Sequence, residues 1–204
     1  MPAPLSEKER AEIKRRLTDA AESCLKTTGI RKTSVDELTR RAGIAKGTFY
    51  LFYPSKELLF FDVINAFHET AERLLAARLK EVAYLDARRT LYSVAPSVLA
   101  DIFTDLFRFA DGSFMPELIR NGELEYLMRK LPDEAVAAHH AADAAMFERL
   151  TAVLPDGMGK KHTAEVVSAA FRLLFLTLLH KREIGEAVYF DAVGLLLNGL
   201  IKEL

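Results

Sequence analysis

The sequence predicts an all-α protein. Apolar residues recur at helical spacing along most of its 204 residues, glycine and proline divide this pattern into segments, and we find neither an alternating strand pattern nor a repeat of fixed period. Half of the residues are hydrophobic, which is enough for one large domain or for a small domain joined to a larger one. We expect a three-helix domain over residues 1–54 and a larger helical domain over residues 55–204.

The composition excludes several classes of protein. The single cysteine, Cys24, cannot form an intrachain disulfide, and its place in a helical pattern favours a buried thiol over a redox sensor. The first ten residues lack the apolar core of a signal peptide, and no apolar run reaches the roughly 18 residues of a membrane span. We therefore expect a soluble, cytoplasmic protein.

Charge is divided unevenly along the chain. Residues 1–56 contain 12 Lys or Arg and 7 Asp or Glu, a net charge of +5, whereas residues 57–204 contain 16 and 22, a net charge of −6. Binding to the phosphates of a nucleic acid requires positive charge. The division therefore predicts that the N-terminal domain faces DNA and that the acidic remainder is held away from it.

The first helix is expected from about Leu5 to Thr28, with Ser6 as its N-cap and Gly29 as its end. Its inner stripe consists of Ile13, Leu17, Ala20, Ala21, Cys24 and Leu25. Arg31 and Lys32 then fall in a loop, where contact with phosphate and plain solvation are both open.

Residues 33–56 predict two short helices joined by a tight turn. Ser34 can cap the first helix, and Glu37, three positions later, can complete a capping box. Gly43 lies where the chain reverses, and glycine adopts a left-handed backbone there at little steric cost.

The second short helix is expected from Lys46 to about Phe52 and is too short to be stable alone. Its apolar face is supplied by Phe49, Phe52 and Tyr53. Two helices joined in this way form a helix-turn-helix, which offers its second helix to a DNA major groove.

These residues resemble the DNA-binding segment of the TetR family of bacterial transcriptional repressors. The matching motifs are Thr33-Ser34-Val35, Arg41-Ala42-Gly43-Ile44, Lys46-Gly47-Thr48-Phe49-Tyr50 and Tyr53-Pro54-Ser55-Lys56-Glu57-Leu58. They cover about the first quarter of the chain. Three positions depart from the family pattern: Ala45 stands where a capping Ser is usual, Thr39 where Ala is commoner, and Leu51 where a polar or aromatic residue is common.

We expect DNA contacts from Ser34, Val35, Lys46, Gly47, Thr48, Tyr50, Leu51 and Lys56. Lys46, Thr48 and Leu51 are assigned to the groove, where an exposed Leu can meet a thymine methyl. Ser34, Tyr50 and Lys56 are assigned to phosphates, and Gly47 would let the backbone approach closely. The resemblance supports Tyr50 and Lys56 most directly, while a plain surface role for Lys56 stays open.

A long helix is expected from about Lys56 to Val82, and it would link the two domains as a lever, as the resemblance also implies. Pro96 predicts the first turn of a helix that ends near Ala110, with a short helix before it. Further helices are expected over Pro116–Arg120, Glu123–Lys130 and Pro132 to about Val153, followed by a loop at residues 155–159.

The last two helices, about Ala164–Leu179 and Glu186–Lys202, are apolar on nearly all sides. A soluble helix of this kind must be buried on all sides, and we expect a second copy of the chain to cover it, as the resemblance implies. Burial within a single chain is the alternative. The predicted dimer interface consists of Val167, Phe171, Leu174, Leu178, Val193, Leu196, Leu197 and Leu200, with Gly194 and Gly199 allowing close approach.

The larger domain contains many aromatic and Met side chains, which suit a pocket for an apolar or aromatic small molecule or an ordinary core. The candidates are Phe67, Phe103, Phe107, Tyr126, Met128, Phe147, Phe171 and Phe175. His139 and His140 are adjacent and cannot share a metal ion in the usual i, i+4 manner. We expect no metal, no cofactor and no enzymatic activity.

Three functions remain open from the sequence. The first is a homodimeric repressor that binds a palindromic operator and is released by a small-molecule effector. The second is a DNA-binding protein without an effector. The third is a dimeric small-molecule-binding protein that has lost DNA binding, against which the intact motif and the charge of +5 both argue.

Overall fold

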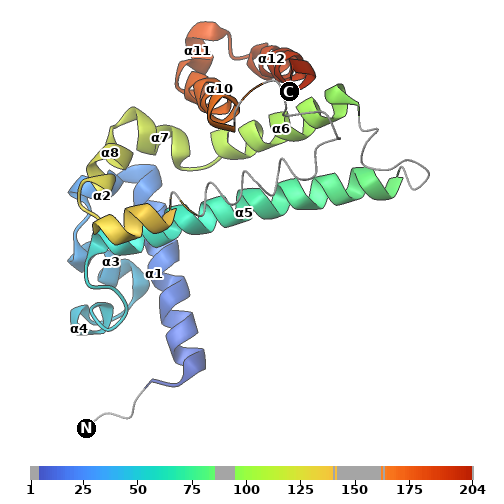
Figure 1. Cartoon of the computed structure of the whole chain (residues 1–204). Helices are drawn as coiled ribbons and strands as arrows, with labels where there is room; N and C mark the ends of the chain where they lie inside the picture. Colours follow the sequence, from blue (N-terminus) through green and yellow to red (C-terminus); the bar gives the residue numbers. More distant parts are fainter. Residues whose placement is uncertain (1–4, 86–94, 140, 142–161, 163, 204) are drawn as a thin grey trace. The chain divides into compact units, whose positions relative to one another are not determined.

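The computed structural model describes residues 5–85, 95–139, 141, 162 and 164–203. Every regular element in these residues is helical, so the prediction of an all-α fold is confirmed (Figure 1). No helix in this part of the chain is long and apolar enough to cross a membrane.

Contacts within the chain group it into two compact units. The N-terminal unit comprises Met1–His68 and Glu117–Val136, and the C-terminal unit comprises Glu69–Pro116 and Ala137–Leu204. Helix α5, Lys56–Leu85, contributes residues to both units. The chain therefore leaves the N-terminal unit within α5, returns to it at Glu117 and leaves it again after Val136.

The N-terminal unit begins with α1, Glu7–Thr27. The hydroxyl of Ser6 accepts a hydrogen bond from the backbone N–H of Glu9, and the Glu9 carboxylate accepts the N–H of Ser6 in return, which completes a capping box. All six apolar residues of the predicted inner stripe are buried. The N-cap and the buried face of this helix were therefore predicted correctly.

The other helices of the N-terminal unit are short. They are α2 (Gly29–Lys32), α3 (Val35–Ala42), α4 (Lys46–Phe49), α7 (Met115–Arg120), which begins in the C-terminal unit, and α8 (Glu123–Met128). The prediction of a loop at Arg31 and Lys32 was wrong, because both residues belong to α2. The core of this unit includes Leu17 of α1, Ile30 of α2, Leu38 of α3, Phe49 of α4 and Leu59 of α5, all of which are fully buried.

The C-terminal unit is built on α6 (Pro96–Asp111), which packs against α12 (Tyr189–Glu203). Pro96 occupies the first turn of α6, as predicted. Gly194 of α12 faces Thr104 of α6, and a Cβ at Gly194 would lie 3.4 Å from the Thr104 hydroxyl. Gly194 therefore allows close packing of α12 against α6 within the chain, and its predicted role in the approach of a second chain stays a prediction.

The segment between the last two helices differs from the prediction. Helix α10, Ala164–Leu176, gives way to a 3₁₀ turn at Thr177–His180 and to α11, Lys181–Ile184. The Thr177 hydroxyl lies 2.6 Å from the Leu174 carbonyl and 2.8 Å from the Tyr189 hydroxyl, and these hydrogen bonds link the tightened turn to the start of α12.

Several predictions fall on residues outside the described part of the chain. These are the short helix before Pro96, the loop at residues 155–159 and the end of the helix that begins after Pro132, of which residues 133–139 are helical.

Candidate nucleic-acid interface

Helices α3 and α4 are joined by a tight turn at Gly43, as predicted. The Ser34 hydroxyl accepts a hydrogen bond from the backbone N–H of Glu37 at 3.1 Å and caps α3. Gly43 has φ +63° and ψ +42°, the left-handed conformation that a helix end favours for glycine. These local features fix the angle at which the chain enters α4.

The expected capping box at α3 is only half formed. The carboxylate of Glu37 accepts hydrogen bonds from Arg40 and Arg41 instead of reaching back to Ser34, and these bonds hold the pKa of Glu37 below its ordinary value. Two guanidinium groups within one turn compete better for the carboxylate than a single backbone N–H does.

Thr39, a departure from the family pattern, fits the interior of the module. Its side chain is buried, and its hydroxyl donates to the carbonyls of Val35 at 2.9 Å and Asp36 at 3.1 Å. Because the hydroxyl is satisfied, a buried threonine costs little here.

Helix α4 covers only Lys46–Phe49 and is shorter than predicted, with turn residues from Tyr50 onward. Ala45 provides no side-chain cap. The helix depends on packing: Phe49 is fully buried, and its ring centroid lies 6.1 Å from that of Tyr53. The Tyr53 hydroxyl in turn donates to Asp62 of α5 at 2.7 Å, and burial together with this bond raises the pKa of Tyr53 well above its ordinary value.

The outward face of α4 and its following turn is open. Tyr50 is 52% exposed and Leu51 is 64% exposed, Lys46 and Gly47 are exposed, and Thr48 is half-buried. A Cβ at Gly47 would meet no atom within 4 Å. A small, rigid, exposed element with polar, basic and apolar groups has the form needed to read base edges in a major groove.

Lys46 is held by an acidic neighbour on α3. Its ammonium lies 2.9 Å from Oδ1 of Asp36, and both side chains are exposed. The hydrogen bond to Asp36 raises the pKa of Lys46 above its ordinary value. Of the other predicted DNA-binding residues, Ser34 is exposed and Val35 is half-buried.

Lys56 lies in a different environment from the other predicted contacts. Its ammonium donates to the backbone carbonyls of Ile30 at 2.8 Å, Arg31 at 3.3 Å and Thr33 at 2.7 Å. An ammonium has three N–H donors, and these three carbonyls can use all of them. The structure thus gives Lys56 an internal role that its place in the first turn of α5 did not indicate.

Helix α8 contacts the same region. Glu123 is buried and accepts a hydrogen bond from the backbone N–H of Arg31 at 3.0 Å. The guanidinium of Arg31 donates to the carbonyl of Gly122 at 2.7 Å and lies 5.2 Å from the centre of the Tyr126 ring. Sequence reasoning missed these contacts, because nothing local to either segment indicates a partner about ninety residues away.

The predicted ligand-binding residues separate into two groups. In the C-terminal unit, Phe103 pairs with Phe171 at 4.8 Å and Phe107 with Phe175 at 6.0 Å between ring centroids. Phe67, Tyr126 and Met128 belong to the N-terminal unit, and Phe147 lies outside the described residues.

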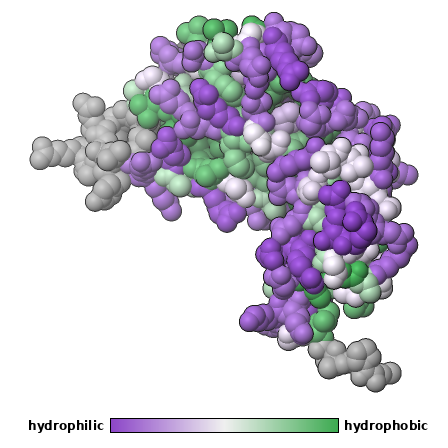
Figure 2. All heavy atoms as spheres, turned by 180° about the vertical axis from the view of Figure 1, so that it is seen from behind, coloured by the Kyte–Doolittle hydropathy of each residue, from purple (hydrophilic) through white to green (hydrophobic). Residues whose placement is uncertain are grey.

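The predicted interface residues also divide. Leu178, Val193 and Leu197 are at most 3% exposed and therefore offer little surface to a second chain. Leu196 is 56% exposed, while Phe171, Leu174 and Leu200 are half-buried; the side chain of Val167 is outside the described residues. Leu173 and Leu195, which the prediction omitted, are 67% and 73% exposed. On the face drawn in Figure 2, residues of hydrophobic type reach the surface between residues of hydrophilic type.

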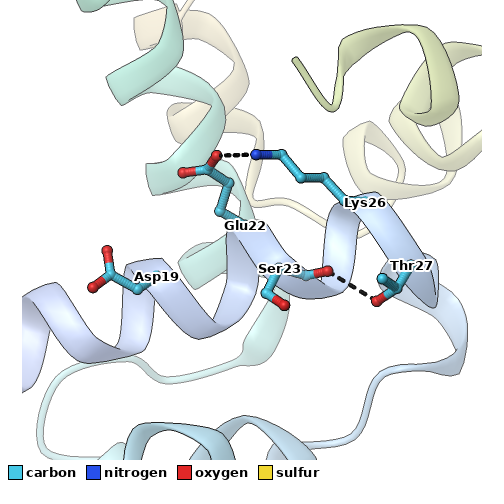
Figure 3. A pocket seen from close by; sticks show the side chains of 5 residues that line it. All are labelled: Asp19, Glu22, Ser23, Lys26 and Thr27. Carbon is cyan, nitrogen blue, oxygen red and sulfur yellow. Dashed lines mark hydrogen bonds and ion pairs between the residues drawn. The ribbon is translucent and has the colours of Figure 1, made fainter. Parts of the chain in front are cut away.

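A shallow surface hollow on α1 does not resemble a ligand site. It is lined by Asp19, Glu22, Ser23, Lys26 and Thr27, all from one helix (Figure 3). The Lys26 ammonium lies 2.8 Å from Glu22, and the Thr27 hydroxyl donates to the Ser23 carbonyl at 2.9 Å. Among the described residues, no three His, Cys, Asp or Glu side chains are grouped to hold a metal ion.

Known proteins resemble this chain in sequence and in fold. The family model described as bacterial regulatory proteins, tetR family, matches residues 17–63, which include the whole of α2, α3 and α4. The uncharacterized HTH-type transcriptional regulator YuxN of Bacillus subtilis is 31% identical over 99 residues, 48% of this chain, and the aligned stretch spans only 31% of that relative's length.

Solved structures share the fold along nearly the whole chain. A TetR-family transcriptional regulator of Mesorhizobium loti has a TM-score of 0.62 at 17% identity, covering 94% of this chain and 96% of that one. The transcriptional regulator FadR of Bacillus subtilis, solved in complex with stearoyl-CoA, has a TM-score of 0.57 at 16% identity, covering 93% and 98%. Residues 17–63 are therefore similar to the helix-turn-helix segment of the tetR family of bacterial regulatory proteins, and the chain shares the fold of these solved regulators.

Proposed function

We propose that this chain is a transcriptional regulator that binds a palindromic DNA operator as a homodimer in the cytoplasm. The exposed face of α4 carries the proposal. It presents Tyr50, Leu51 and Gly47 outward from a helix fixed by the buried ring of Phe49. The excess of positive charge in residues 1–56 suits the phosphates on either side of a groove.

Dimerisation is supported by exposed leucines near the end of the chain. Leu173 and Leu176 on α10, and Leu195 and Leu196 on α12, are between 46% and 73% exposed. Gly199 lies on the same stretch of α12, is exposed, and has open space where a Cβ would be. A second copy covering these residues would remove apolar surface from water and bring two α4 helices to one DNA duplex.

We further propose repression that a small apolar or aromatic effector relieves. This proposal is supported by the aromatic rings shared by α6 and α10, where Phe103 pairs with Phe171 and Phe107 with Phe175, because an effector of this kind would bind among such rings. Helix α5 shares its residues between both units, so it is the element through which an effector would alter the spacing of the α4 helices. By linkage, an effector that lowers DNA affinity must itself bind more weakly when DNA is bound.

The experiment that tests DNA binding is selection from a pool of random-sequence duplexes by the purified chain. We expect an inverted repeat to be enriched, and we expect its affinity to fall linearly with salt on a log–log plot. If repeated rounds enrich no sequence and no duplex binds at low salt, the chain is not a DNA-binding regulator. A dimeric small-molecule-binding protein would then be the better description.

The effector is tested with the same duplex. Stearoyl-CoA, a simple phenol and a fatty acid are each added to the preformed complex, and fluorescence anisotropy reports the release of DNA. Release by one of them at saturation supports the regulated repressor. A complex that survives all of them, together with a C-terminal unit that binds none of them in calorimetry, favours a DNA-binding protein that does not respond to these classes of effector.

A further inference from the structure

Helix α2 has no cap of its own. It consists of four residues, Gly29–Lys32, and the side chain of Thr28 before it makes no capping hydrogen bond. A helix leaves backbone N–H groups unpaired at its start and carbonyls unpaired at its end. A single turn is also far too short to be stable without outside support. The partners that α2 needs must therefore come from other elements.

Glu123 of α8 supplies the partner at the start of α2. Its carboxylate accepts the backbone N–H of Arg31 at 3.0 Å, and the side chain is only 8% exposed. Its other oxygen is so close to Gly29 that a Cβ there would lie 2.9 Å away. The positions of α2 and α8 side by side are clear in Figure 1. A negative charge at this end of a helix is also favoured by the helix dipole.

Lys56 of α5 supplies the partners at the other end. Its ammonium donates to the carbonyls of Ile30, Arg31 and Thr33, which close α2. A positive charge at the end of a helix is again the favoured sign. The helix is thus held between a carboxylate and an ammonium from two different helices.

The position of α2 determines where α3 begins, because the two helices are directly connected. Thr33 is 1% exposed, and its hydroxyl donates to the Gly29 carbonyl at 2.6 Å. The next residue, Ser34, is the N-cap of α3, and α3 leads through Gly43 into α4. No flexible linker separates α2 from α3, so a displacement of α2 would change the start of α3.

We propose that Glu123 is a positioning residue for DNA binding: it touches no DNA, and it orients the α3–α4 pair by holding α2. This inference rests on the proposed function. Glu117–Val136 is joined at both ends to chain of the C-terminal unit. A change in that unit that moved α8 would therefore reach the DNA-binding helices through Glu123 as well as through α5.

Three variants test the proposal. Glu123→Ala removes the cap, and Glu123→Gln keeps an oxygen that can accept the Arg31 N–H but removes the charge. Glu125→Ala is the matched control, because Glu125 lies on the same helix, loses the same charge, and its side chain is 76% exposed. The measurements are the hydrogen-exchange rate of the Arg31 amide and the dissociation constants for the selected duplex and for a random-sequence duplex.

We expect Glu123→Ala to raise exchange at Arg31 about tenfold or more and to weaken binding of the selected duplex by a similar factor. Affinity for the random duplex should change much less, because it depends on the excess positive charge of residues 1–56, which is unaltered, and not on the orientation of α4. For Glu123→Gln, the exchange rate at Arg31 and the dissociation constant for the selected duplex should lie between those of the wild type and of Glu123→Ala. Glu125→Ala should match the wild type in all three measurements.

The ratio of the two DNA affinities separates positioning from plain stability. A partly unfolded N-terminal unit would lose affinity for both duplexes by the same factor, and that result would overturn the proposal. If Glu123→Ala does not fold, Glu123→Gln tests the proposal instead. A wild-type exchange rate at the Arg31 amide, together with a wild-type ratio of the two DNA affinities, would then overturn the proposal. A wild-type chain that binds no duplex would end both the proposed function and this inference, whereas an unchanged ratio in the variants would end this inference alone.

Discussion

Lys46 and Asp36 form an ion pair between the first residue of α4 and the first turn of α3, with 2.9 Å between the ammonium nitrogen and a carboxylate oxygen. Both side chains are more than half exposed, so the pair contributes little to folding. It nevertheless places a negative charge beside the residue that we assign to the DNA groove. DNA would have to compete with Asp36 for Lys46.

The change Asp36→Asn should strengthen DNA binding, because it frees Lys46 and removes a carboxylate that repels phosphate. We expect tighter binding to selected and random duplexes alike, with the log–log salt dependence steeper by about 0.9 for each additional phosphate that the protein neutralises. Fluorescence anisotropy over a series of salt concentrations measures both the affinity and its salt dependence. Asp133→Asn, an exposed position of the same unit, is the control and should change neither. Weaker binding by Asp36→Asn would show that Asp36 helps to present Lys46.

Tyr50→Ala should weaken binding of the selected duplex by roughly tenfold or more, because two copies of the residue would lose their DNA contact in one complex. Tyr50→Phe keeps the edge-on packing of the ring against Phe49, whose centroid is 5.3 Å away, and removes only the hydroxyl. If the hydroxyl contacts phosphate, the two variants should bind almost equally weakly. Wild-type affinity in both variants would remove Tyr50 from the DNA-binding surface.

Gly29→Ala should destabilise the N-terminal unit. Gly29 has φ +77°, a conformation that costs a residue with a Cβ roughly 1–2 kcal/mol, and the new methyl group would also collide with the Glu123 carboxylate. Thermal and denaturant unfolding monitored by circular dichroism measure the loss. A variant as stable as the wild type would mean that α2 and α8 separate without cost, which would also weaken the case for Glu123.

Gly47→Ala should weaken DNA binding without destabilising the N-terminal unit. Its backbone is helical and a Cβ there meets nothing within 4 Å, so the free energy of unfolding should be unchanged or raised by up to about 1 kcal/mol. DNA affinity should fall, because a methyl group would stand between the α4 backbone and the groove. Increased stability with unchanged affinity for the selected duplex would show that DNA does not approach Gly47.

Leu196→Glu should convert the proposed dimer to monomers, because it places a charge within the exposed leucines of α10 and α12. Leu51→Glu is a matched control, since Leu51 is 64% exposed and Leu196 is 56% exposed. We expect Leu51→Glu to remain dimeric and to lose DNA binding through repulsion from phosphate. Analytical ultracentrifugation measures the assembly state. A dimeric Leu196→Glu variant would place the interface elsewhere.

The helix-turn-helix could be predicted from the sequence because its determinants are local. Ser34 caps the helix that it precedes, Gly43 takes the backbone conformation that only glycine adopts easily, and Phe49 lies on the one face that α4 can bury. Each of these residues acts on neighbours that lie only a few positions away in the sequence. The end of α4 does not follow from such local features, and α4 is three residues shorter than expected.

The role of charged residues could not be predicted, because it depends on contacts between distant segments. Lys56 looks like a phosphate ligand at the start of α5, yet its ammonium donates hydrogen bonds to backbone carbonyls that lie 23 to 26 positions earlier. Glu123 looks like a surface residue in the first turn of a short helix, yet it is buried against Arg31.

The sequence also did not reveal which side of the last helices is exposed. Leu196 and Leu197 are adjacent and chemically identical, but one is 56% exposed and the other is fully buried. When a helix is apolar on all sides, hydrophobic periodicity does not reveal which side its own chain covers. Only the packing of α12 against α6 separates the core residues from those available to a second chain.

The central claim, a homodimer that presents two α4 helices to one operator, is tested most directly by native mass spectrometry of the chain with the selected duplex. The claim predicts a complex of two chains on one duplex, and a duplex containing only half of the inverted repeat should bind far more weakly. A single chain bound tightly to the full duplex, with the half-site bound equally well, would contradict it.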